Sequence, residues 1–408
     1  MLISPFLALR PKPEIAAQVA SRPYDVLNSD EAKTEAEGND VSFLHITKAE
    51  IDLPAGTDTH SQSVYEKAKQ NLDAFIQKGI LFREDKPCYY IYELVMNARS
   101  QTGIVCGSSV DDYDNDLIKK HEFTRPEKEQ DRINHIQTTK AQTGNVFLTY
   151  RTVTAIDELI SDWKKKHEPV YNFTAEDGIQ HAVWIVNDNA IISSITDGFA
   201  SLVPLTYIAD GHHRAASAAK VRKALGAKAT KNADYFLTTL FPSDQLHIMD
   251  YNRVVKDLNG LDETEFLKKI YDDFDVEKMP SQLSPTHLHE FGMYLGGNWY
   301  KLTSKEGSFT EDPIGVLDVT ILQNNLLDKI LGIKDQRTDK RIDFVGGIRG
   351  LSELEKRVDS GEMQVAFSLH PVTIDQLFNI ADSGNVMPPK STWFEPKLRD
   401  GLLTYLID

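Results

Sequence analysis

Hydrophobic and polar residues along the chain follow two periods, which are typical of helices and of strands. Residues 63–79 carry apolar side chains at spacings of three and four, which predicts an amphipathic helix. Apolar runs bounded by turn residues predict strands at 181–186 and 234–241. Further helices are predicted over 153–167 and 190–201. Because strands and helices alternate through the middle of the chain, we expect an α+β or mixed α/β fold with some parallel pairing.

The same pattern continues to the C-terminus without a low-complexity linker. A short helix is predicted over 252–258, followed by helices over 262–272 and 316–331 and a hairpin around Gly296-Gly297. Because no linker of distinct composition interrupts these elements, we expect the parts of the chain to pack closely.

The length of 408 residues is too great for one small core and favours two or three packed units. We expect an N-terminal α+β part over 1–150 that contributes substrate-site residues, a core over 151–260, and a C-terminal α/β part over 261–408. In this interpretation the two outer parts add mixed sheets to the core.

One strand-turn-helix segment, LTYIADGHHRAASAAK at 205–220, gathers polar side chains at a helix N-terminus. Residues 205–208 predict a buried strand, and residues 215–220 predict a helix. The turn between them consists of Asp210, Gly211, His212, His213 and Arg214.

This turn has the composition of an anion site. The first turn of a helix leaves backbone N–H groups without intrahelical partners at the positive end of the helix dipole, so it attracts phosphate. Gly211 permits close approach of the backbone, and His212, His213 and Arg214 add side-chain donors. Asp210 can cap the helix, bind a metal or accept a proton. Ordinary capping needs only one side-chain oxygen, and adjacent histidines on a helix point about 100° apart, which argues against zinc.

Composition excludes some classes of function. The net charge of −16 argues against a general nucleic-acid-binding protein, because nonspecific affinity comes from Lys and Arg that neutralise phosphates. Only Cys88 and Cys106 occur, flanking a predicted hairpin, which is typical of a reducing compartment. The N-terminus has no basic leader and no apolar run reaches membrane-spanning length. We therefore expect a cytoplasmic protein without membrane or nucleic-acid partners.

Two segments of the N-terminal part carry candidate chemistry. His121-Glu122 precedes a charged helix, and a carboxylate beside an imidazole is a reasonable general base or metal ligand. SRPYDV presents Arg22, Tyr24 and Asp25 on a loop that proline makes rigid.

The C-terminal segment MPPKSTWFEPK places Lys390, Ser391 and Thr392 after a rigid Pro-Pro pair. A lysine beside two hydroxyls is suited to phosphate binding, although the glycines of a Walker loop are absent. The flanking Trp393 and Phe394 could stack on a base.

The segment YIADGHHRAASAA resembles the phosphate-binding signature shared by the ParB and sulfiredoxin superfamily. The chain is similar to the domain-of-unknown-function family numbered 1015 through four segments that span nearly its whole length. They are SRPYDV, HEFTRPEKEQDR, IADGHHRAA and MPPKSTWFEPK. The resemblance implies a ParB/sulfiredoxin-like core over 151–260.

The DGHHR form is similar to that of free-serine kinases, which phosphorylate L-serine to O-phosphoserine with a nucleotide donor. The resemblance therefore implies a kinase of amino acid metabolism that uses ATP or ADP and Mg²⁺. Asp210 would lie beside the metal and the transferring phosphoryl group, with Glu122 and neighbouring His121 as the catalytic base site and Asp210 as the alternative base. The nucleotide phosphates would be held by Gly211, His212, His213, Arg214, Lys390, Ser391 and Thr392.

The amino acid acceptor would need partners for its own carboxylate and ammonium groups. Arg22 and Asp25 form a complementary pair for them, with Tyr24 between the two. A ParB-like nucleotide-binding regulatory protein without kinase activity and a nonenzymatic metabolite binder are the competing hypotheses. The sequence leaves the donor, the acceptor and the oligomeric state open.

Overall fold

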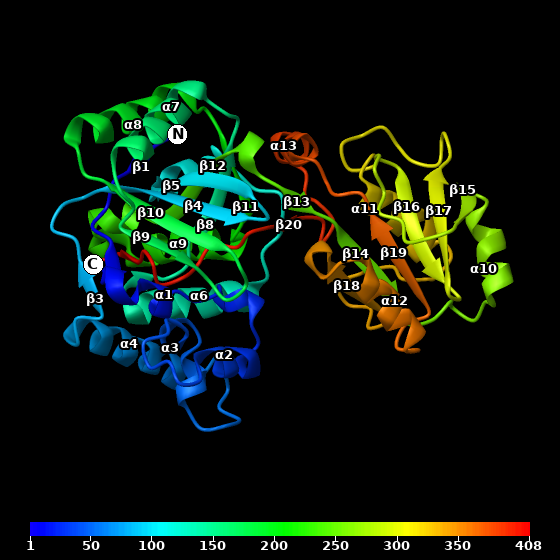
Figure 1. Cartoon of the computed structure of the whole chain (residues 1–408), viewed down its shortest axis with the longest axis horizontal. Helices are drawn as coiled ribbons and strands as arrows, with labels where there is room; N and C mark the ends of the chain where they lie inside the picture. The colour runs from blue at the N-terminus through cyan, green and yellow to red at the C-terminus, as the bar shows by residue number, and fades with distance from the viewer. The chain divides into compact units, whose positions relative to one another are not determined.

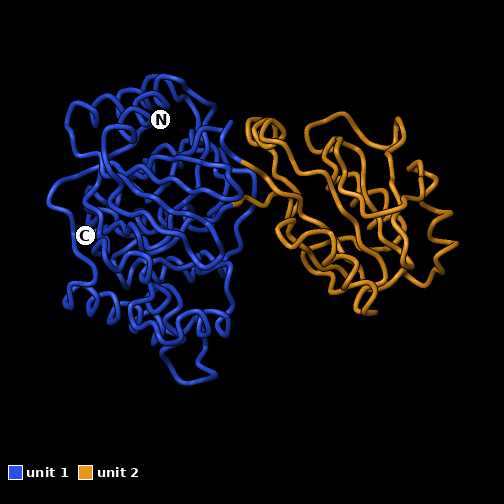
Figure 2. Tube along the Cα trace, in the orientation of Figure 1, with its two compact units in different colours: residues 1–246, 396–408 blue, residues 247–395 orange.

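The computed structural model describes residues 1–408, which form two compact units with separate sheets. Unit 1 comprises residues 1–246 and 396–408, and unit 2 comprises residues 247–395 (Figure 2). Unit 2 is therefore inserted into the sequence of unit 1, whose last segment comes after the insertion. The three-part division expected from the sequence, with boundaries near 150 and 260, remains a prediction.

Unit 1 is built on a nine-stranded mixed sheet. Its strands lie in the order β6 (Ile118–Lys119), β11 (Thr206–Asp210), β8 (Val146–Tyr150), β12 (Tyr235–Pro242), β5 (Arg99–Ser109), β4 (Tyr89–Met96), β10 (Gln180–Val186) and β9 (Tyr171–Thr174), while β1 (Ile3–Ser4) pairs with β5. The pairs β11–β6 and β12–β8 are parallel and the others are antiparallel, so the expected mixed α/β fold is confirmed.

Helices cover both faces of this sheet. Those of unit 1 are α1 (Ala16–Val19), α2 (Ser29–Ala36), α3 (Leu44–Thr47), α4 (Gln62–Gln77), α5 (Val110–Asp114), α6 (Pro126–Thr139), α7 (Thr154–Lys166), α8 (Asn189–Leu202) and α9 (His212–Leu225). Figure 1 shows α7 and α8 on one side of the sheet and α9 and α6 on the other, with α4 beyond α6. Two small ribbons complete the unit: β2 (Leu9–Pro11) with β3 (Leu81–Arg83), and β7 (Ala141–Gln142) with β21 (Tyr405–Leu406).

The position of α9 follows from its composition. From Ala215 onwards its buried side chains are small and occupy several sides of the helix, namely those of Ala215, Ala216, Ser217, Ala218, Ala219 and Val221. A helix that is apolar on more than one side belongs between two layers, and small side chains let it approach both closely. The start of α9 is thereby fixed between the sheet and α6.

Unit 2 has a six-stranded antiparallel sheet. Its strands lie in the order β15 (Phe274–Met279), β17 (Asn298–Ser304), β16 (Glu290–Leu295), β19 (Val365–Leu369), β14 (Tyr251–Val255) and β18 (Ile342–Gly346). Its helices are α10 (Glu263–Ile270), α11 (Asp318–Leu322), α12 (Leu351–Asp359) and α13 (Ile374–Asp382), and β13 (Ile248–Met249) pairs with β20 (Trp393–Phe394). The predicted hairpin around Gly296-Gly297 is the turn between β16 and β17.

The helix predicted over 252–258 is wrong, because this segment contains strand β14. β14 pairs with β18 on one side and β19 on the other, so tertiary pairing overrides the local pattern. Asn252 and Arg253 are fully buried there. These two polar residues interrupt the run of apolar residues by which a central strand is recognised in a sequence. The helix predicted over 316–331 also differs, since α11 continues as a π-helix over Gln323–Asp328.

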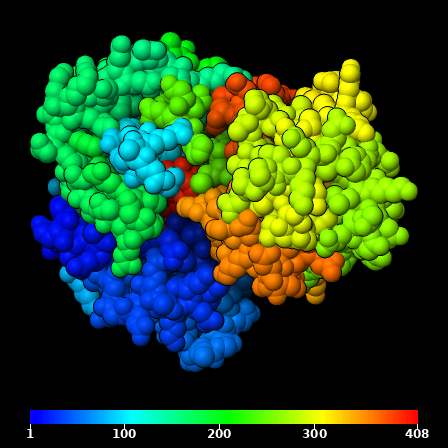
Figure 3. Space-filling model, turned by 45° about the vertical axis from the view of Figure 1, so that its right-hand side comes forward, coloured from blue at the N-terminus to red at the C-terminus, as the bar shows by residue number.

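The space-filling view in Figure 3 shows N-terminal segments (blue) and central segments (green) forming one continuous surface on unit 1. None of the chain's helices combines the length and the apolar character that crossing a membrane requires.

Cys88 and Cys106 are both buried, free thiols. Burial raises the pKa of Cys88 to about 11 and that of Cys106 to about 12, so neither is an activated nucleophile.

Candidate functional site

Gly211 sets the geometry at the start of α9. Its φ of +97° lies in the left-handed region that favours glycine. A Cβ atom at this position would lie 3.3 Å from Nε of Arg214 and 3.3 Å from Cα of Val146. The helix begins at His212, before the predicted Ala215, so both histidines and Arg214 belong to its first turn.

The N-terminus of α9 has no side-chain cap. Asp210, which could have capped it, instead accepts a hydrogen bond from Nζ of Lys397 at 3.1 Å and lies 3.7 Å from Nη2 of Arg214. Ordinary capping therefore does not explain Asp210. The N–H groups of the first helical turn keep their capacity to bind an anion.

The charge state of Asp210 follows from these neighbours. Burial alone would raise the pKa of its carboxyl group, but the positive charges of Lys397 and Arg214 outweigh burial and hold that pKa well below its ordinary value. Asp210 is thus ionised at neutral pH. A carboxylate stabilised in this way is a weak proton acceptor, although it can still orient a cation.

Arg214 connects the turn to the N-terminal segment. Its side chain is 9% exposed, and its Nη2 lies 3.1 Å from Oδ2 of Asp25. Nη1 donates to the carbonyl of Asn145, whereas Nε is buried without a hydrogen-bond partner. Because Nε lies against the position of the missing Cβ of Gly211, this free donor is at the turn itself. The structure therefore brings Asp25 and Arg214 together across most of unit 1's sequence.

The two histidines of the turn accept hydrogen bonds from the loop before α6. Nε2 of His212 accepts from the backbone N–H of His121 at 3.4 Å, and Nε2 of His213 accepts from that of Arg125 at 2.9 Å. Burial lowers the pKa of both imidazoles, so they are neutral at physiological pH. In a neutral ring whose Nε2 accepts, the proton lies on Nδ1. Each histidine thus offers one N–H donor rather than a positive charge.

His121 and Glu122 lie beside this turn. The rings of His121 and His212 meet edge to face with centroids 4.5 Å apart. Oε2 of Glu122 is 3.7 Å from Nδ1 of His212, and about half of the Glu122 side chain is exposed. Burial lowers the pKa of His121 to about 4, and its Nδ1 is buried without a partner. Both residues of this pair are therefore brought next to the DGHHR turn, with Glu122 on the solvent side.

The last segment of the chain adds two residues that the sequence did not identify as a site. Lys397 pairs with Asp210, and Asp400 is 2% exposed with Oδ2 unpartnered. A Cβ at Gly144 would lie 3.3 Å from Oδ1 of Asp400 and 3.3 Å from Cδ of Arg214, so three segments meet here. Burial raises the pKa of Asp400 to about 7, with Arg214 opposing the shift. The only signal in the sequence was Lys397 at the end of the MPPKSTWFEPK segment.

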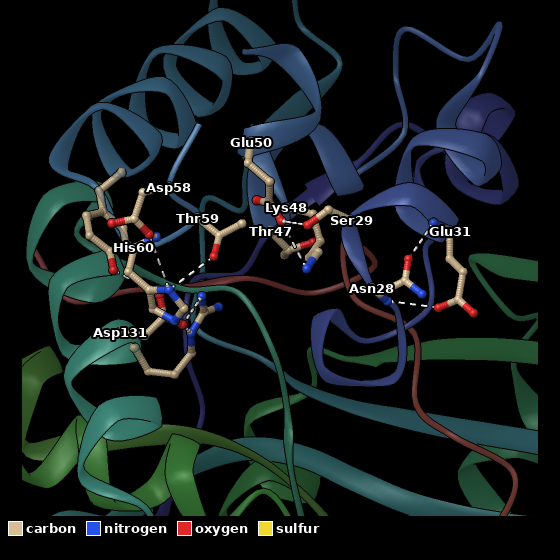
Figure 4. Close-up of polar contacts among 12 residues, drawn as sticks. Asn28, Ser29, Glu31, Thr47, Lys48, Glu50, Asp58, Thr59, His60 and Asp131 are labelled. Carbon is tan, nitrogen blue, oxygen red and sulfur yellow. Dashed lines mark hydrogen bonds and ion pairs between the residues drawn. The ribbon is translucent and has the colours of Figure 1, made fainter. Parts of the chain in front are cut away.

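A cavity of about 260 Å³ opens beside Asp25. Its polar lining consists of Tyr24, Asp25, Thr47, Lys48, Glu50, Thr59, His60, Tyr65, Glu127, Lys128, Asp131, Arg132 and His135. Nζ of Lys48 lies 3.0 Å from Oε1 of Glu50, which also accepts from Oγ of Ser29 at 2.8 Å (Figure 4). Groups of both charges therefore surround the space.

Tyr24 forms one wall of this cavity. Its ring lies under the guanidinium of Arg132, with 3.9 Å between Cζ and the ring centroid. Arg132 is itself held by Asp131, whose other oxygen accepts from the hydroxyl of Tyr65 at 2.9 Å. Tyr24 and Asp25 are thus on the cavity, whereas Arg22 is not among its lining residues. Arg22 instead forms an exposed ion pair with Glu35 at 2.6 Å.

Lys390, Ser391 and Thr392 belong to unit 2 and form a turn there. Oγ of Ser391 donates to the carbonyl of Pro388 at 2.6 Å, and the carbonyl of Lys390 accepts from Nη2 of Arg253 at 3.1 Å. The Lys390 ammonium lies 5.6 Å from the centroid of the Tyr251 ring. The side chains of Lys390 and Ser391 therefore have partners inside unit 2.

No group of three or more His, Cys, Asp or Glu side chains in residues 1–408 is placed to hold a metal ion. Magnesium is often held by one or two carboxylates together with substrate phosphates, so it needs no such cluster. Asp210 fits this mode through an oxygen that Lys397 does not occupy. A metal at Asp210 is thus compatible with the residues only together with bound phosphate.

The fold was compared with solved structures. A free serine kinase in complex with AMP has 12% identity and a TM-score of 0.38, covering 74% of this chain and 91% of that chain. A conserved hypothetical protein from Pyrococcus furiosus has 13% identity and a TM-score of 0.37, covering 74% and 94%. SbnI from Staphylococcus aureus, truncated at its C-terminus, has 12% identity and a TM-score of 0.33, covering 74% and 87%. Likeness at this level does not establish a shared activity.

The sequence was also compared with curated proteins and with family models. No curated protein matches the chain. The family described as "Protein of unknown function (DUF1015)" matches residues 3–320, which include three of the four segments that carried the predicted resemblance. The chain therefore belongs to the DUF1015 family.

Proposed function

We propose that this protein is a nucleotide-dependent kinase that transfers a phosphoryl group from ATP or ADP to the hydroxyl of a small acceptor, free L-serine. The observation that carries the proposal is the start of α9. Its N–H groups have no side-chain cap, and the buried Nε of Arg214 beside them has no partner. An arrangement of uncapped N–H groups and a spare guanidinium donor is suited to phosphate oxygens.

The donors at this turn match what a nucleotide phosphate requires. In our proposal the phosphates bind the backbone at Gly211, Nδ1–H of His212 and His213, and Nε of Arg214. Phosphoryl transfer needs positioned donors and little covalent chemistry from the protein. Neutral histidines supply directed hydrogen bonds, and Arg214 supplies the positive charge.

Asp210 and Glu122 have different roles in this proposal. Asp210 is ionised and holds Mg²⁺, which supplies charge neutralisation when it is bound with the nucleotide. Glu122, with His121 beside it, accepts the proton of the acceptor hydroxyl, because a half-exposed carboxylate is a better base than one paired with two cations. The acceptor oxygen then forms a bond to the terminal phosphorus, and the bond from that phosphorus to the bridging oxygen of the donor breaks.

The cavity beside Asp25 suits the acceptor. Its volume of about 260 Å³ corresponds to roughly nine water molecules at about 30 Å³ each, which accommodates an amino acid and is small for a whole nucleotide. Groups of both charges line it, as a zwitterion requires. We place the acceptor against Tyr24 and Asp25, with Arg22 outside the cavity as a residue that could contribute only by leaving Glu35.

Lys390, Ser391 and Thr392 stay in the proposal as secondary nucleotide-binding candidates. The hydroxyl of Ser391 and the ammonium of Lys390 already have partners within unit 2, unlike the Nε donor of Arg214 at the DGHHR turn. Lys390 has the best remaining capacity among them, since a lysine ammonium has three donors.

The proposal is tested by incubating the full-length protein with L-serine, Mg²⁺ and either ATP or ADP, and detecting O-phosphoserine by mass spectrometry. We expect phosphoserine with at least one donor and none without Mg²⁺. Lack of product with both donors across several small alcohols would overturn the kinase proposal. Nucleotide binding without any product would instead favour the alternative, a ParB-like regulatory protein without kinase activity.

A further inference from the structure

Phe123 is the most exposed large hydrophobic side chain of the protein. It is 75% exposed, whereas the next, Leu2, is 55% exposed. A phenylalanine loses favourable burial free energy when it stays in water, so folding stability does not account for its position. A single exposed hydrophobic residue is common in itself, and the surroundings of Phe123 decide whether it has a role.

The loop that carries Phe123 is fixed to the DGHHR turn on both sides. Two residues before it, the N–H of His121 bonds to His212, and two residues after it, the N–H of Arg125 bonds to His213. Two residues span at most about 7 Å of extended chain. The backbone of Phe123 is therefore held close to the first turn of α9.

The neighbours of Phe123 do not form an apolar patch. Glu122 and Arg125 are exposed and charged, and the hydroxyl of Thr124 donates to Glu129. A lone ring among polar groups is a poor surface for docking another protein, which requires a contiguous apolar area. It is a good surface for a flat π-system, because stacking needs one ring face and tolerates polar edges.

We propose that Phe123 stacks on the base of the nucleotide whose phosphates bind at the start of α9. This inference rests on the proposed function, since it assumes that the DGHHR turn holds nucleotide phosphates. The two backbone anchors hold the residue that carries the ring beside the phosphate donors, which puts both within the reach of a single nucleotide. Stacking recognises the face of a base and not its edge, so this contact adds affinity for adenine and guanine nucleotides alike.

The test compares a ligand that has a base with one that lacks it. Binding of Mg·ADP and of Mg·pyrophosphate is measured by calorimetry for the wild-type protein, Phe123→Ala and Phe123→Trp, with Tyr271→Ala as the control. Tyr271 is a suitable control because it is an aromatic residue 52% exposed in unit 2. Circular dichroism checks that each variant is folded.

We expect Phe123→Ala to weaken ADP binding roughly tenfold and to leave pyrophosphate binding unchanged. Phe123→Trp should bind ADP as well as the wild type does, and Tyr271→Ala should change the affinity for neither ligand. The inference is overturned if Phe123→Ala binds ADP as the wild type does, or if it loses both ligands equally, which would assign the residue to loop structure. If the wild-type protein binds neither ligand, the proposed nucleotide site is overturned as well. Failure of the stacking inference alone is thus distinguished from failure of the proposed function.

Discussion

The DGHHR turn of unit 1 and the KST turn of unit 2 (Lys390, Ser391 and Thr392) both carry polar donors suited to phosphate, but they differ in what these donors contact. At the DGHHR turn the helix start is uncapped and Nε of Arg214 has no partner. At the KST turn, Ser391 donates to Pro388 and the Lys390 ammonium faces the Tyr251 ring. Residue types suited to phosphate therefore identify a candidate site. Only the hydrogen-bond partners of each donor distinguish a turn whose donors are available to a ligand from a turn whose donors are already bonded within the protein.

The largest effect is expected from Asp210→Asn. If this substitution had no effect on activity, the functional distinction between the DGHHR turn and the KST turn would fail. The substitution removes the negative charge that we assign to Mg²⁺ while keeping the shape of the side chain. We expect turnover to fall about 10³-fold, with nucleotide affinity nearly unchanged, as measured by phosphoserine formation and calorimetry. Full activity in Asp210→Asn would exclude Asp210 from catalysis.

Arg214→Ala tests the binding side of the same turn. Removal of the guanidinium leaves Asp25 and Asp210 without their shared cation in a buried setting. We expect a loss of about 3 kcal/mol in the free energy of unfolding, measured in urea. Nucleotide affinity should fall more than the maximal rate does.

Arg214→Lys separates charge from geometry at this position. Lysine keeps the positive charge but cannot provide both the Asp25 contact and the free Nε donor. We expect partial recovery of stability with little recovery of nucleotide affinity. Recovery of both would show that the charge alone matters and that the unpartnered Nε has no role.

Asp400→Asn examines the other buried carboxyl group at the turn. The pKa of Asp400 in the folded protein is raised to about 7, above the ordinary value of 3.8. Between pH 3.8 and pH 7 the folded state therefore keeps a proton on Asp400 that the unfolded state has lost. Stability from this group is therefore greatest below pH 4 and is lost as pH rises towards 7. Asparagine imitates the protonated form, so the variant should lose less stability than the wild type over this range, by about 2 kcal/mol.

The measurement for Asp400→Asn is urea unfolding at pH 5 and pH 8. A difference between variant and wild type that stays constant with pH would contradict the raised pKa. Asp210 has the opposite sign, since its lowered pKa contributes stability that is lost as pH falls below its ordinary range. Acid titration of Asp210 therefore lowers stability and cannot account for a gain in stability that Asp400 gives as pH falls.

Local pattern predicted much of the fold and one part of the site. Helix α4 and strand β10 begin and end within two residues of their predicted limits, because amphipathic spacing and apolar runs specify them directly. The DGHHR turn was recognisable for the same reason, as a strand followed by polar donors and an alanine-rich helix.

Long-range pairing was not predictable in this way. Lys397 reaches Asp210 across 187 positions, and Arg214 reaches Asp25 across 189. Contacts at such separations depend on the path of the whole chain, including the return to unit 1 after unit 2. Burial of Arg253 in β14 depends equally on strands far away in sequence, which is why periodicity assigned a helix there.

The smallest effects are expected in the KST turn. Ser391→Ala removes a buried hydroxyl that donates to Pro388, so we expect a loss of about 1 kcal/mol in the free energy of unfolding and no change in nucleotide affinity. Lys390→Ala should weaken nucleotide binding by no more than about twofold, since a single exposed ammonium contributes little. If either variant lowered affinity as strongly as Arg214→Ala, satisfied partners inside unit 2 would not prevent a phosphate role. The distinction between the two turns would then have to rest on something other than free donors.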